Sequence, residues 1–228
     1  MADDQKPAGG VRARVRAELT AEIKALATKQ LETEGASAIS LRAIAREVGM
    51  ASSAIYRYFA SRDELLTALI IDAFNDLGEA VEARDAAVRR EDYRGRFTAI
   101  ATGIRSWAIA NPHQYALIYG SPVPGYKAPE DTIDPAIRAP VALMSVVVEA
   151  KSPGGAQRSR SQLAASLQGL ADFTGNSVPV GDVAAAVEAW GEIFGLVSLE
   201  LFGHFVNAID NPEHFFGHVV DAMADRIL

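Results

Sequence analysis

The sequence predicts an all-α protein, in which a small three-helix head containing a helix-turn-helix precedes a larger helical bundle. Three observations lead to this fold class. Apolar residues recur at steps of three and four in every long segment, which is the period of a helix with one buried face. No stretch alternates polar and apolar residues as a half-buried strand does, and no repeat of fixed period occurs. Glycines, prolines and capping side chains separate the segments.

The head is predicted to begin with one long helix. Residues 1–12 include Pro7, Gly9 and Gly10, and we expect a disordered lead-in there. A helix is expected over residues 12–34, and Gly35 supplies its end. The chain then divides into a head of residues 13–61 and a second domain of residues 62–228.

A tight turn joins the next two predicted helices. Ser40 is a good N-cap for a short amphipathic helix, and Gly49 can adopt the left-handed conformation that ends it. A third helix is expected over residues 54–59, with Ser52 or Ser53 as its cap. Helix, tight turn and helix together form a helix-turn-helix.

The rest of the chain is predicted to be helical as well. Ser61 and Glu64 have the spacing of a capping box, so a long helix is expected over residues 62–90. The pair Asn111–Pro112 ends the helix after it, because proline disfavours helical backbone in the residue before it. Further helices are expected at residues 93–110, 135–150, 157–174, 180–208 and 212–227, with a loop at 121–126.

Composition excludes several classes of protein. The chain has 228 residues, 49% apolar and 22% charged, as is typical of a globular protein. It has no cysteine and only four histidines, so we expect no disulfide, no metal site and no cofactor. No window approaches the roughly 18 consecutive apolar residues of a membrane span, and the N-terminus lacks a secretory signal. We expect a cytoplasmic protein with no membrane partner.

Charge is distributed unevenly along the chain. The net charge is −7, but residues 1–62 hold 10 Lys and Arg against 7 Asp and Glu, a net +3. Residues 63–228 hold 12 against 22, a net −10. This asymmetry suits a DNA-binding head on an acidic body that the duplex would repel.

The predicted helix-turn-helix leaves polar side chains on its outer face. Ile55 and Phe59 lie four residues apart and face inward, so hydroxyls, phenols and a guanidinium remain outside. Arg57 can donate two hydrogen bonds to a guanine, whereas Arg42 and Arg62 lie at helix N-termini and suit phosphate. The candidate DNA contacts are Arg42, Ser52, Ser53, Tyr56, Arg57, Tyr58 and Arg62. We name residues 52–58 the recognition segment.

The run LRAIAREVGMASSAIYRYFASRDELL at residues 41–66 resembles the DNA-binding segment of the tetracycline-repressor (TetR) family. The likeness covers roughly residues 13–70 and is most specific in Tyr-x-Tyr-Phe followed by a small residue, a cap, a basic residue, an acidic residue and Leu-Leu. It implies a ligand-responsive transcriptional regulator, with repression the expected mode and activation left open. It also implies a homodimer on a palindromic double-stranded DNA operator. The same candidate contacts match the family's recognition helix and flanking phosphate contacts.

A weaker resemblance concerns the body, in residues 107–126 and 190–195. These resemble the subgroup whose C-terminal domain carries a Trp-x-x-x-His-Gly motif, with Phe194 in place of the histidine. The resemblance implies that residues 62–228 bind a ligand and dimerise, and Phe194 favours a small hydrophobic or amphipathic effector. The candidate pocket residues are Trp107, Tyr115, Tyr119, Phe173, Trp190 and Phe194, although such aromatic residues more often belong to a core.

A homodimer is also expected from the geometry of DNA recognition, because one recognition helix contacts only a few base pairs. We place the interface on the last two long helices, where small residues at spacings of four and eight allow close approach. The candidate interface residues are Gly191, Gly195, Leu196, Val197, Leu199, Glu200, Gly203 and His204. Ordinary packing within the bundle is the alternative.

Two other classes of protein remain open at this point. Carboxylates at helical spacing, such as Asp72, Asp76 and Glu79, could suggest an enzyme, but such residues usually form a solvated face. No nucleophile motif, phosphate loop or paired histidines support catalysis, so we do not expect an enzyme. A structural protein built of helices is the third possibility.

Overall fold

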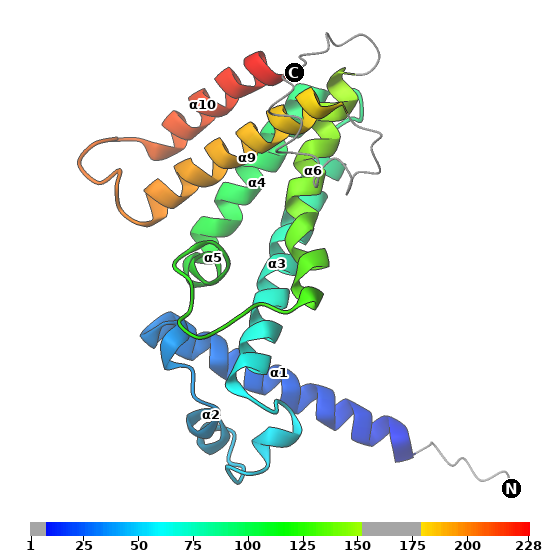
Figure 1. Ribbon diagram of the computed structural model, residues 1–228, viewed down its shortest axis with the longest axis vertical. Coiled ribbons are helices and arrows are strands. Elements are labelled where there is room, and N and C mark those ends of the chain that lie inside the picture. The colour runs from blue at the N-terminus through cyan, green and yellow to red at the C-terminus, as the bar shows by residue number, and fades with distance from the viewer. Residues whose placement is uncertain (1–7, 152–178) are drawn as a thin grey trace, which may run out of the picture. The chain divides into compact units, whose positions relative to one another are not determined.

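All regular structure is helical in residues 8–151 and 179–228, the part of the chain that the computed structural model describes, and no strand occurs there (Figure 1). The predicted all-α fold class is therefore confirmed. The predicted helix at residues 157–174 lies outside the described residues. None of the described helices is both long enough and apolar enough to cross a membrane.

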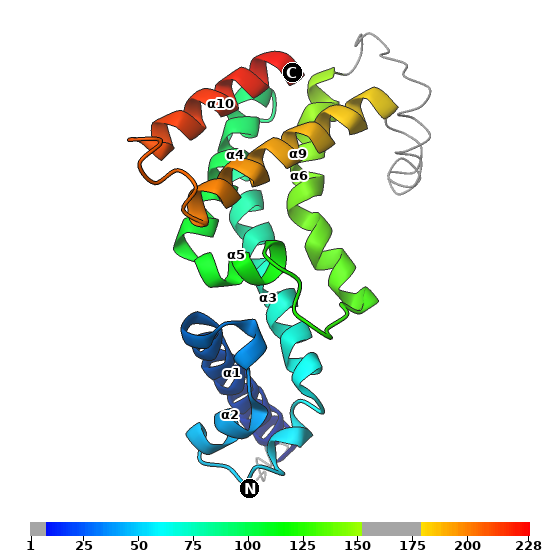
Figure 2. The ribbon, with the colours of Figure 1, turned by 60° about the vertical axis from the view of Figure 1, so that its left-hand side comes forward.

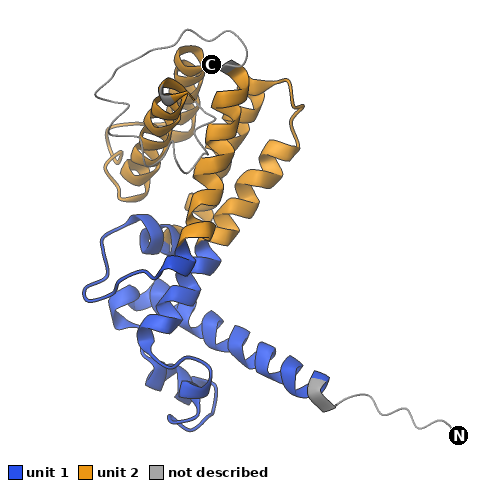
Figure 3. Cartoon of the chain, turned by 45° about the vertical axis from the view of Figure 1, so that its right-hand side comes forward, with its two compact units in different colours: residues 1–73, 113–132 blue, residues 74–112, 133–228 orange. Residues whose placement is uncertain are grey.

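The chain forms two compact units (Figure 3). Unit 1 comprises Met1–Ala73 and His113–Thr132, and unit 2 comprises Phe74–Pro112 and Ile133–Leu228. Helix α3 (Arg62–Ala86) is shared, because its first half belongs to unit 1 and its second half to unit 2. The predicted division into residues 13–61 and 62–228 concerns functional domains and stays a prediction.

Unit 1 is built around a long first helix. The elements beside the first half of α3 are α1 (Ala8–Glu34), η1 (Ala36–Ala38), α2 (Leu41–Glu47), η2 (Ile55–Arg57), α5 (Pro112–Tyr119) and η3 (Glu130–Thr132). Helix α1 starts at Ala8, four residues before its predicted start, so residues 8–12 are helical and not part of a disordered lead-in. It ends before Gly35, whose φ of 80° confirms the predicted stop.

The core of unit 1 joins α1, α2, η2 and α3. Its fully or nearly buried side chains are Ile23, Ala27, Leu31, Ile39, Leu41, Ile44, Ala45, Ile55, Phe59, Leu65, Leu66 and Leu69. Leu117, Val123 and Tyr126, from α5 and the loop after it, pack against this core. The Tyr126 hydroxyl also lies 2.9 Å from Oγ1 of Thr67 on α3, so this distant segment is part of the head's packing.

Unit 2 is a bundle of the second half of α3 with α4 (Tyr93–Ala110), α6 (Ile133–Lys151), α9 (Val180–Leu201) and α10 (Pro212–Ile227). Helix α6 packs on α4 and α9, and α10 packs on α4 and α9 (Figures 1 and 2). The predicted bounds of α4 and α10 are confirmed, because their caps form. Asp92 accepts the Gly95 amide at 2.9 Å, and Asn211 accepts the His214 amide at 2.9 Å.

Helices α3, α9 and α5 differ from the prediction, and α6 (predicted over residues 135–150) extends over Ile133–Lys151. Helix α3 ends at Ala86 and not at residue 90. Helix α9 ends at Leu201 and not at residue 208, because Gly203 (φ 81°) and Asn207 (φ 62°) adopt left-handed backbone that a helix cannot contain. Helix α5 was not predicted. Pro112 indicates the end of the preceding helix, but proline is also favoured in the first turn of a new one, and α5 begins there.

Arginine–carboxylate pairs hold unit 2 together. Arg96 on α4 is 1% exposed and donates to Asp85 on α3 at 2.7 and 3.0 Å and to Glu149 on α6 at 2.7 Å. These hydrogen bonds raise the pKa of Arg96 above its usual range, so it stays charged although it is buried. Arg105 on α4 likewise donates to both oxygens of Glu200 on α9, at 2.6 and 2.8 Å.

Candidate nucleic-acid interface

The turn after α2 sets the direction of the recognition segment. Ser40 caps α2 by accepting the Ala43 amide at 3.4 Å, as predicted. Gly49 has φ 74°, and the Met50 amide donates to the Ala45 carbonyl at 2.9 Å, which closes the corner. A side chain at position 49 would be strained by this backbone conformation.

The recognition segment contains one turn of 3₁₀-helix, Ile55–Arg57, and the predicted α-helix at residues 54–59 is wrong in type. The Arg57 and Tyr58 amides donate to the carbonyls three residues earlier, at 3.1 and 2.9 Å. Six residues can form few bonds of the α type, and 3₁₀ geometry is common in such short pieces. The segment has Ala54 as its N-cap without a side-chain hydrogen bond, so the predicted cap by Ser52 or Ser53 is also wrong.

Burial divides the recognition segment into an inner and an outer side. Ile55 is fully buried, and Phe59 just beyond the segment is 5% exposed, as predicted. The outer side consists of exposed side chains: Ser52, Ser53, Tyr56 and Arg57. Tyr56 is 45% exposed, which is unusual for so large a ring in a folded chain. The outer side therefore presents two hydroxyls, a phenol and a guanidinium.

Tyr58 and Arg62 are less open than the sequence predicted. The Tyr58 ring is half-buried, packs against the core of unit 1, and has the Arg16 guanidinium 5.4 Å from its centroid. Arg62 is half-buried, donates to the Ala36 carbonyl at 2.8 Å, and lies 3.6 Å from Asp63. Their predicted DNA contacts stay predictions, but both side chains also have a role in holding the head together.

Arg42 is exposed on α2 and makes no hydrogen bond or ion pair with the described part of the chain.

The capping box at the start of α3 forms with a shift of one residue. Ser61 accepts the Glu64 amide at 3.1 Å, and Glu64 accepts the amide of Ala60 at 2.5 Å instead of that of Ser61.

Arg16, which was not among the predicted site residues, positions the recognition segment. Arg16 on α1 donates to the Arg57 carbonyl at 2.9 Å, besides covering the Tyr58 ring. It therefore fixes the last turn of the segment from a helix that lies far earlier in the sequence. The available signal was its place on the same face of α1 as Ile23, seven residues on, where an apolar residue would be expected.

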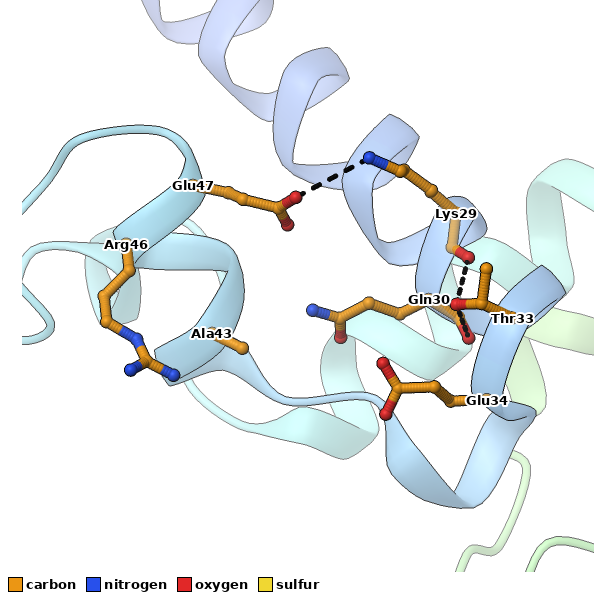
Figure 4. Close-up of a pocket in the computed structure, with 7 residues that line it drawn as sticks. All are labelled: Lys29, Gln30, Thr33, Glu34, Ala43, Arg46 and Glu47. Atoms are coloured by element: carbon orange, nitrogen blue, oxygen red, sulfur yellow. Dashed lines mark hydrogen bonds and ion pairs between the residues drawn. The ribbon is translucent and has the colours of Figure 1, made fainter.

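An open depression of about 510 Å³ lies between α1 and α2 (Figure 4). It is lined by Lys29, Gln30, Thr33, Glu34, Ala43, Arg46 and Glu47. Charges of both signs face it, and Lys29 lies 3.7 Å from Glu47 across it. Its lining residues are mostly charged or polar, so it differs from the apolar ligand pocket that the sequence predicts.

The predicted pocket residues fall into two groups. Trp107, Trp190 and Phe194 belong to unit 2, where the rings of Trp190 and Phe194 lie 4.0 Å apart between centroids. Tyr115 and Tyr119 belong to unit 1, with ring centroids 5.3 Å apart. Burial and the neighbouring Tyr115 raise the pKa of Tyr119 above its usual range. The remaining candidate, Phe173, lies outside the described residues.

The architecture is a helix-turn-helix head with an outward-facing polar segment, joined to a separate helical bundle. Two family models match the chain. One is described as bacterial regulatory proteins of the tetR family and covers residues 23–69, and the other as a tetracyclin repressor-like C-terminal domain and covers residues 97–223.

Individual relatives agree with this match. The regulators Rv1816 of Mycobacterium tuberculosis and Mb1846 of Mycobacterium bovis, both named as HTH-type transcriptional regulators, are 38% identical over 202 residues, 86% of each chain. The crystal structure of the regulatory protein SCO4313 is similar with 35% identity and a TM-score of 0.77, over 95% of this chain and 98% of that one. A Rhodococcus sp. RHA1 protein shares the fold at 24% identity, with a TM-score of 0.70 over 92% and 95% of the two chains.

The chain therefore belongs to the tetracycline-repressor family of bacterial transcriptional regulators, and it is a DNA-binding protein. The names of its relatives are those of regulators and not of enzymes. The predicted resemblance is confirmed. The individual contact residues, the effector and the subgroup motif around Phe194 stay predictions.

Proposed function

We propose that the protein is a ligand-responsive repressor that acts in the cytoplasm, binds a palindromic operator as a homodimer and is released by a small, mostly apolar molecule. One observation carries the DNA-binding part of this proposal. The outer side of the recognition segment exposes Ser52, Ser53, Tyr56 and Arg57, while its inner side is anchored by buried Ile55. A short turn fixed in this way can place its polar groups against base edges without reorganising.

Each proposed contact has a separate role. Arg57 donates to guanine O6 and N7, and the hydroxyls of Ser52, Ser53 and Tyr56 bind base edges or phosphate. Arg42 and Arg62 bind phosphate and set the register, with Arg62 limited by its bond to the Ala36 carbonyl. Tyr58 contributes the edge of its half-buried ring.

The homodimer interface is proposed on α9 and the segment after it. Val187, Gly191, Gly195 and Leu199 recur every four residues and are all exposed, which leaves an apolar and small-residue stripe along one face of the helix. A Cβ atom added at Gly191 or Gly195 would meet nothing within 4 Å. A second copy of the chain can cover this stripe closely.

Several residues of the predicted interface have other roles. Val197 is 1% exposed and belongs to the core, so placing it at the interface was wrong. Glu200 is bound to Arg105, and Leu196 is half-buried. Gly203 and His204 are exposed in the turn after α9, and they stay in the proposed interface.

The dimer can be tested by sedimentation. Leu199→Glu places a charge on the proposed interface and should yield monomers that bind operator weakly. The matched control is Ile133→Glu, which changes an equally apolar side chain, 50% exposed at the start of α6, away from the stripe. If both variants remain dimeric, α9 is not the interface.

The effector is proposed to bind the body, residues 62–228, and the candidate contacts in unit 2 are Trp107, Trp190 and Phe194. The candidates Tyr115 and Tyr119 belong to unit 1, and Phe173 lies outside the described residues. A fold relative at 14% identity, TetR-Q116A of Acinetobacter baumannii AYE, is solved in complex with minocycline, so the fold can hold a small molecule. Release from DNA requires that the effector bind more tightly to the body conformation in which the two heads are wrongly spaced. By linkage, DNA must weaken effector binding by the same factor.

Two measurements test the regulator proposal. Mobility-shift titration with the DNA upstream of the protein's own gene should give a sequence-selective complex whose affinity falls steeply with salt. Thermal-shift screening with apolar metabolites, drugs and acyl-CoA compounds should find molecules that raise the melting temperature and lower operator affinity. A compound that raises the melting temperature without changing DNA affinity would contradict its role as the effector.

A further inference from the structure

The first turns of α1 are basic, and apart from Arg16 their side chains contribute little to the packing of the head. Arg12, Arg14 and Arg16 are exposed, and no acidic residue occurs between Ala8 and Arg16. Val11 and Val15 beside them are 56% and 45% exposed, so these turns bury no apolar face either. In Figure 1 the N-terminal part of α1 extends past α2 within unit 1. Folding of the head alone gives no reason for this helix to be so long.

One face of α1 leads from the core of unit 1 to the recognition segment. Residues 12, 16, 23 and 27 follow one another at steps of four and seven, and therefore share a face. Ile23 and Ala27 are fully buried in the core. Arg16 reaches the Arg57 carbonyl at 2.9 Å and covers the Tyr58 ring. Arg12 lies one helical turn beyond Arg16 on this face, about 6 Å further along the helix.

Arg14 provides an internal contrast. It lies two residues from both Arg12 and Arg16, which places it about 200° around the helix from them. Its Nε lies 3.6 Å from Glu18, whereas Arg12 makes no ion pair with the described part of the chain. The two arginines thus carry the same charge in the same two turns, but among the described residues only Arg14 has an ion-pair partner, and only Arg12 faces the side of the recognition segment.

We propose that Arg12 is a second DNA-binding site of the head, which binds the phosphate backbone of the duplex just outside the bases that the recognition segment contacts. The inference rests on the proposed operator binding and extends it to flanking DNA. A guanidinium is suited to this ligand because it donates in a fork to phosphate oxygens and stays charged. Arg16 has the complementary role of fixing the recognition segment to the same helix, so that both contacts keep one spacing.

The experiment compares two variants on two duplexes. Wild-type protein first selects its preferred sequence from a random DNA library. That sequence is then prepared as a core duplex and as the same core extended by about one helical turn, roughly 10 bp, of arbitrary sequence on each side. The variants are Arg12→Gln and its matched control Arg14→Gln. Fluorescence anisotropy gives the slope of log K against log salt for each pair.

We expect a changed salt slope only for Arg12→Gln on the extended duplex. On the extended duplex, Arg12→Gln should lower the magnitude of the slope by about 1 per lost phosphate contact, hence about 2 per dimer. On the core duplex it should match wild type, and Arg14→Gln should match wild type on both. The melting temperatures of both variants should equal that of wild type, because neither position is packed.

Other results overturn the inference. Equal slopes for Arg12→Gln and Arg14→Gln on the extended duplex would show a diffuse charge effect or none. A changed preference for the flanking sequence in Arg12→Gln would show base readout instead of phosphate binding. Failure of wild-type protein to select any sequence would instead contradict the proposed function itself, so the two failures are distinguishable.

Discussion

Arginines that link separate elements bind different acceptors in unit 1 and in unit 2, whereas Arg14 pairs with Glu18 within α1. In unit 1, Arg16 and Arg62 donate to the neutral carbonyl oxygens of Arg57 and Ala36, and Arg62 has only a loose 3.6 Å pair with Asp63. In unit 2, six arginines pair with carboxylates of described residues: Arg90, Arg94, Arg96, Arg105, Arg138 and Arg226.

This difference accompanies the uneven charge of the chain, which is net +3 over residues 1–62 and net −10 over residues 63–228. A carbonyl oxygen satisfies a guanidinium hydrogen bond without cancelling its charge, whereas a carboxylate cancels it. The head is therefore rigidified by arginines that still contribute positive potential toward DNA. In the body the same side chain acts as a neutralised cross-link between helices. The functional difference lies in the choice of acceptor.

The largest expected effect concerns the buried cross-link of the body. Arg96→Ala leaves Asp85 and Glu149 without their buried partner, and should lower the free energy of unfolding by about 3–5 kcal/mol. Urea denaturation measures this loss. The control is Arg226→Ala, which removes an exposed pair with Glu192 and should cost about 1 kcal/mol or less. Equal losses would show that burial of the pair is irrelevant.

A smaller effect is expected at the outward-facing guanidinium of the head. Arg57→Ala should reduce discrimination between the selected sequence and single-base variants at one position by about 1–3 kcal/mol. The fold should be kept, because it is the Arg57 carbonyl and not its side chain that Arg16 binds. Competition binding against a panel of base substitutions measures the change. Unaltered discrimination at every position would remove Arg57 from the recognition role.

Arg62 can either hold the head together or bind phosphate, and one variant distinguishes these two roles. If its bond to the Ala36 carbonyl is its main role, Arg62→Ala should lower the free energy of unfolding by about 1 kcal/mol and leave the salt slope of DNA binding unchanged. If phosphate binding dominates, the slope should fall by about 1 per subunit at unchanged stability. Urea denaturation and salt titration of the same variant decide between them.

The smallest expected effect is the pH dependence of an exposed pair in the body. Hydrogen bonding to Arg138 lowers the pKa of Glu82 below its ordinary value of 4.5. The pair therefore stabilises the fold above pH 4.5, and this stability is lost as the pH falls through the lowered pKa. At pH 6, Glu82→Gln should cost less than about 1 kcal/mol, since half of the side chain is exposed. The difference in melting temperature should disappear on acidification, and a constant difference would contradict it.

The bounds of a helix could be predicted from the sequence where a capping side chain or a glycine stands at its end. Asp92 and Asn211 cap α4 and α10 through local side-chain hydrogen bonds, so the bounds of both helices could be predicted. Gly35 likewise ends α1 as predicted, and Gly49 has the predicted left-handed backbone. At the end of α9 the apolar period continued to Phe205, and it concealed the break that Gly203 makes.

The candidate site was predictable in its exposure pattern but not in its finer geometry. Burial of Ile55 and exposure of Tyr56 and Arg57 follow from helical spacing, which 3₁₀ and α turns share over so few residues. That spacing does not decide between the third and the fourth preceding carbonyl as acceptor, and the amides of Arg57 and Tyr58 donate to the third whereas that of Phe59 donates to the fourth. The partners of Arg16 and Arg62 depend on contacts 41 and 26 residues away, which no local pattern contains.

The packing of Leu117, Val123 and Tyr126 on the core of unit 1 limits how the protein can be divided. A fragment that stops at residue 61 would lack these side chains, as well as Leu65, Leu66 and Leu69. Such a fragment would expose apolar surface and be prone to aggregate. A chimaera that takes its head from a relative would therefore need to import two stretches of that relative's gene, or to match the residues at this junction.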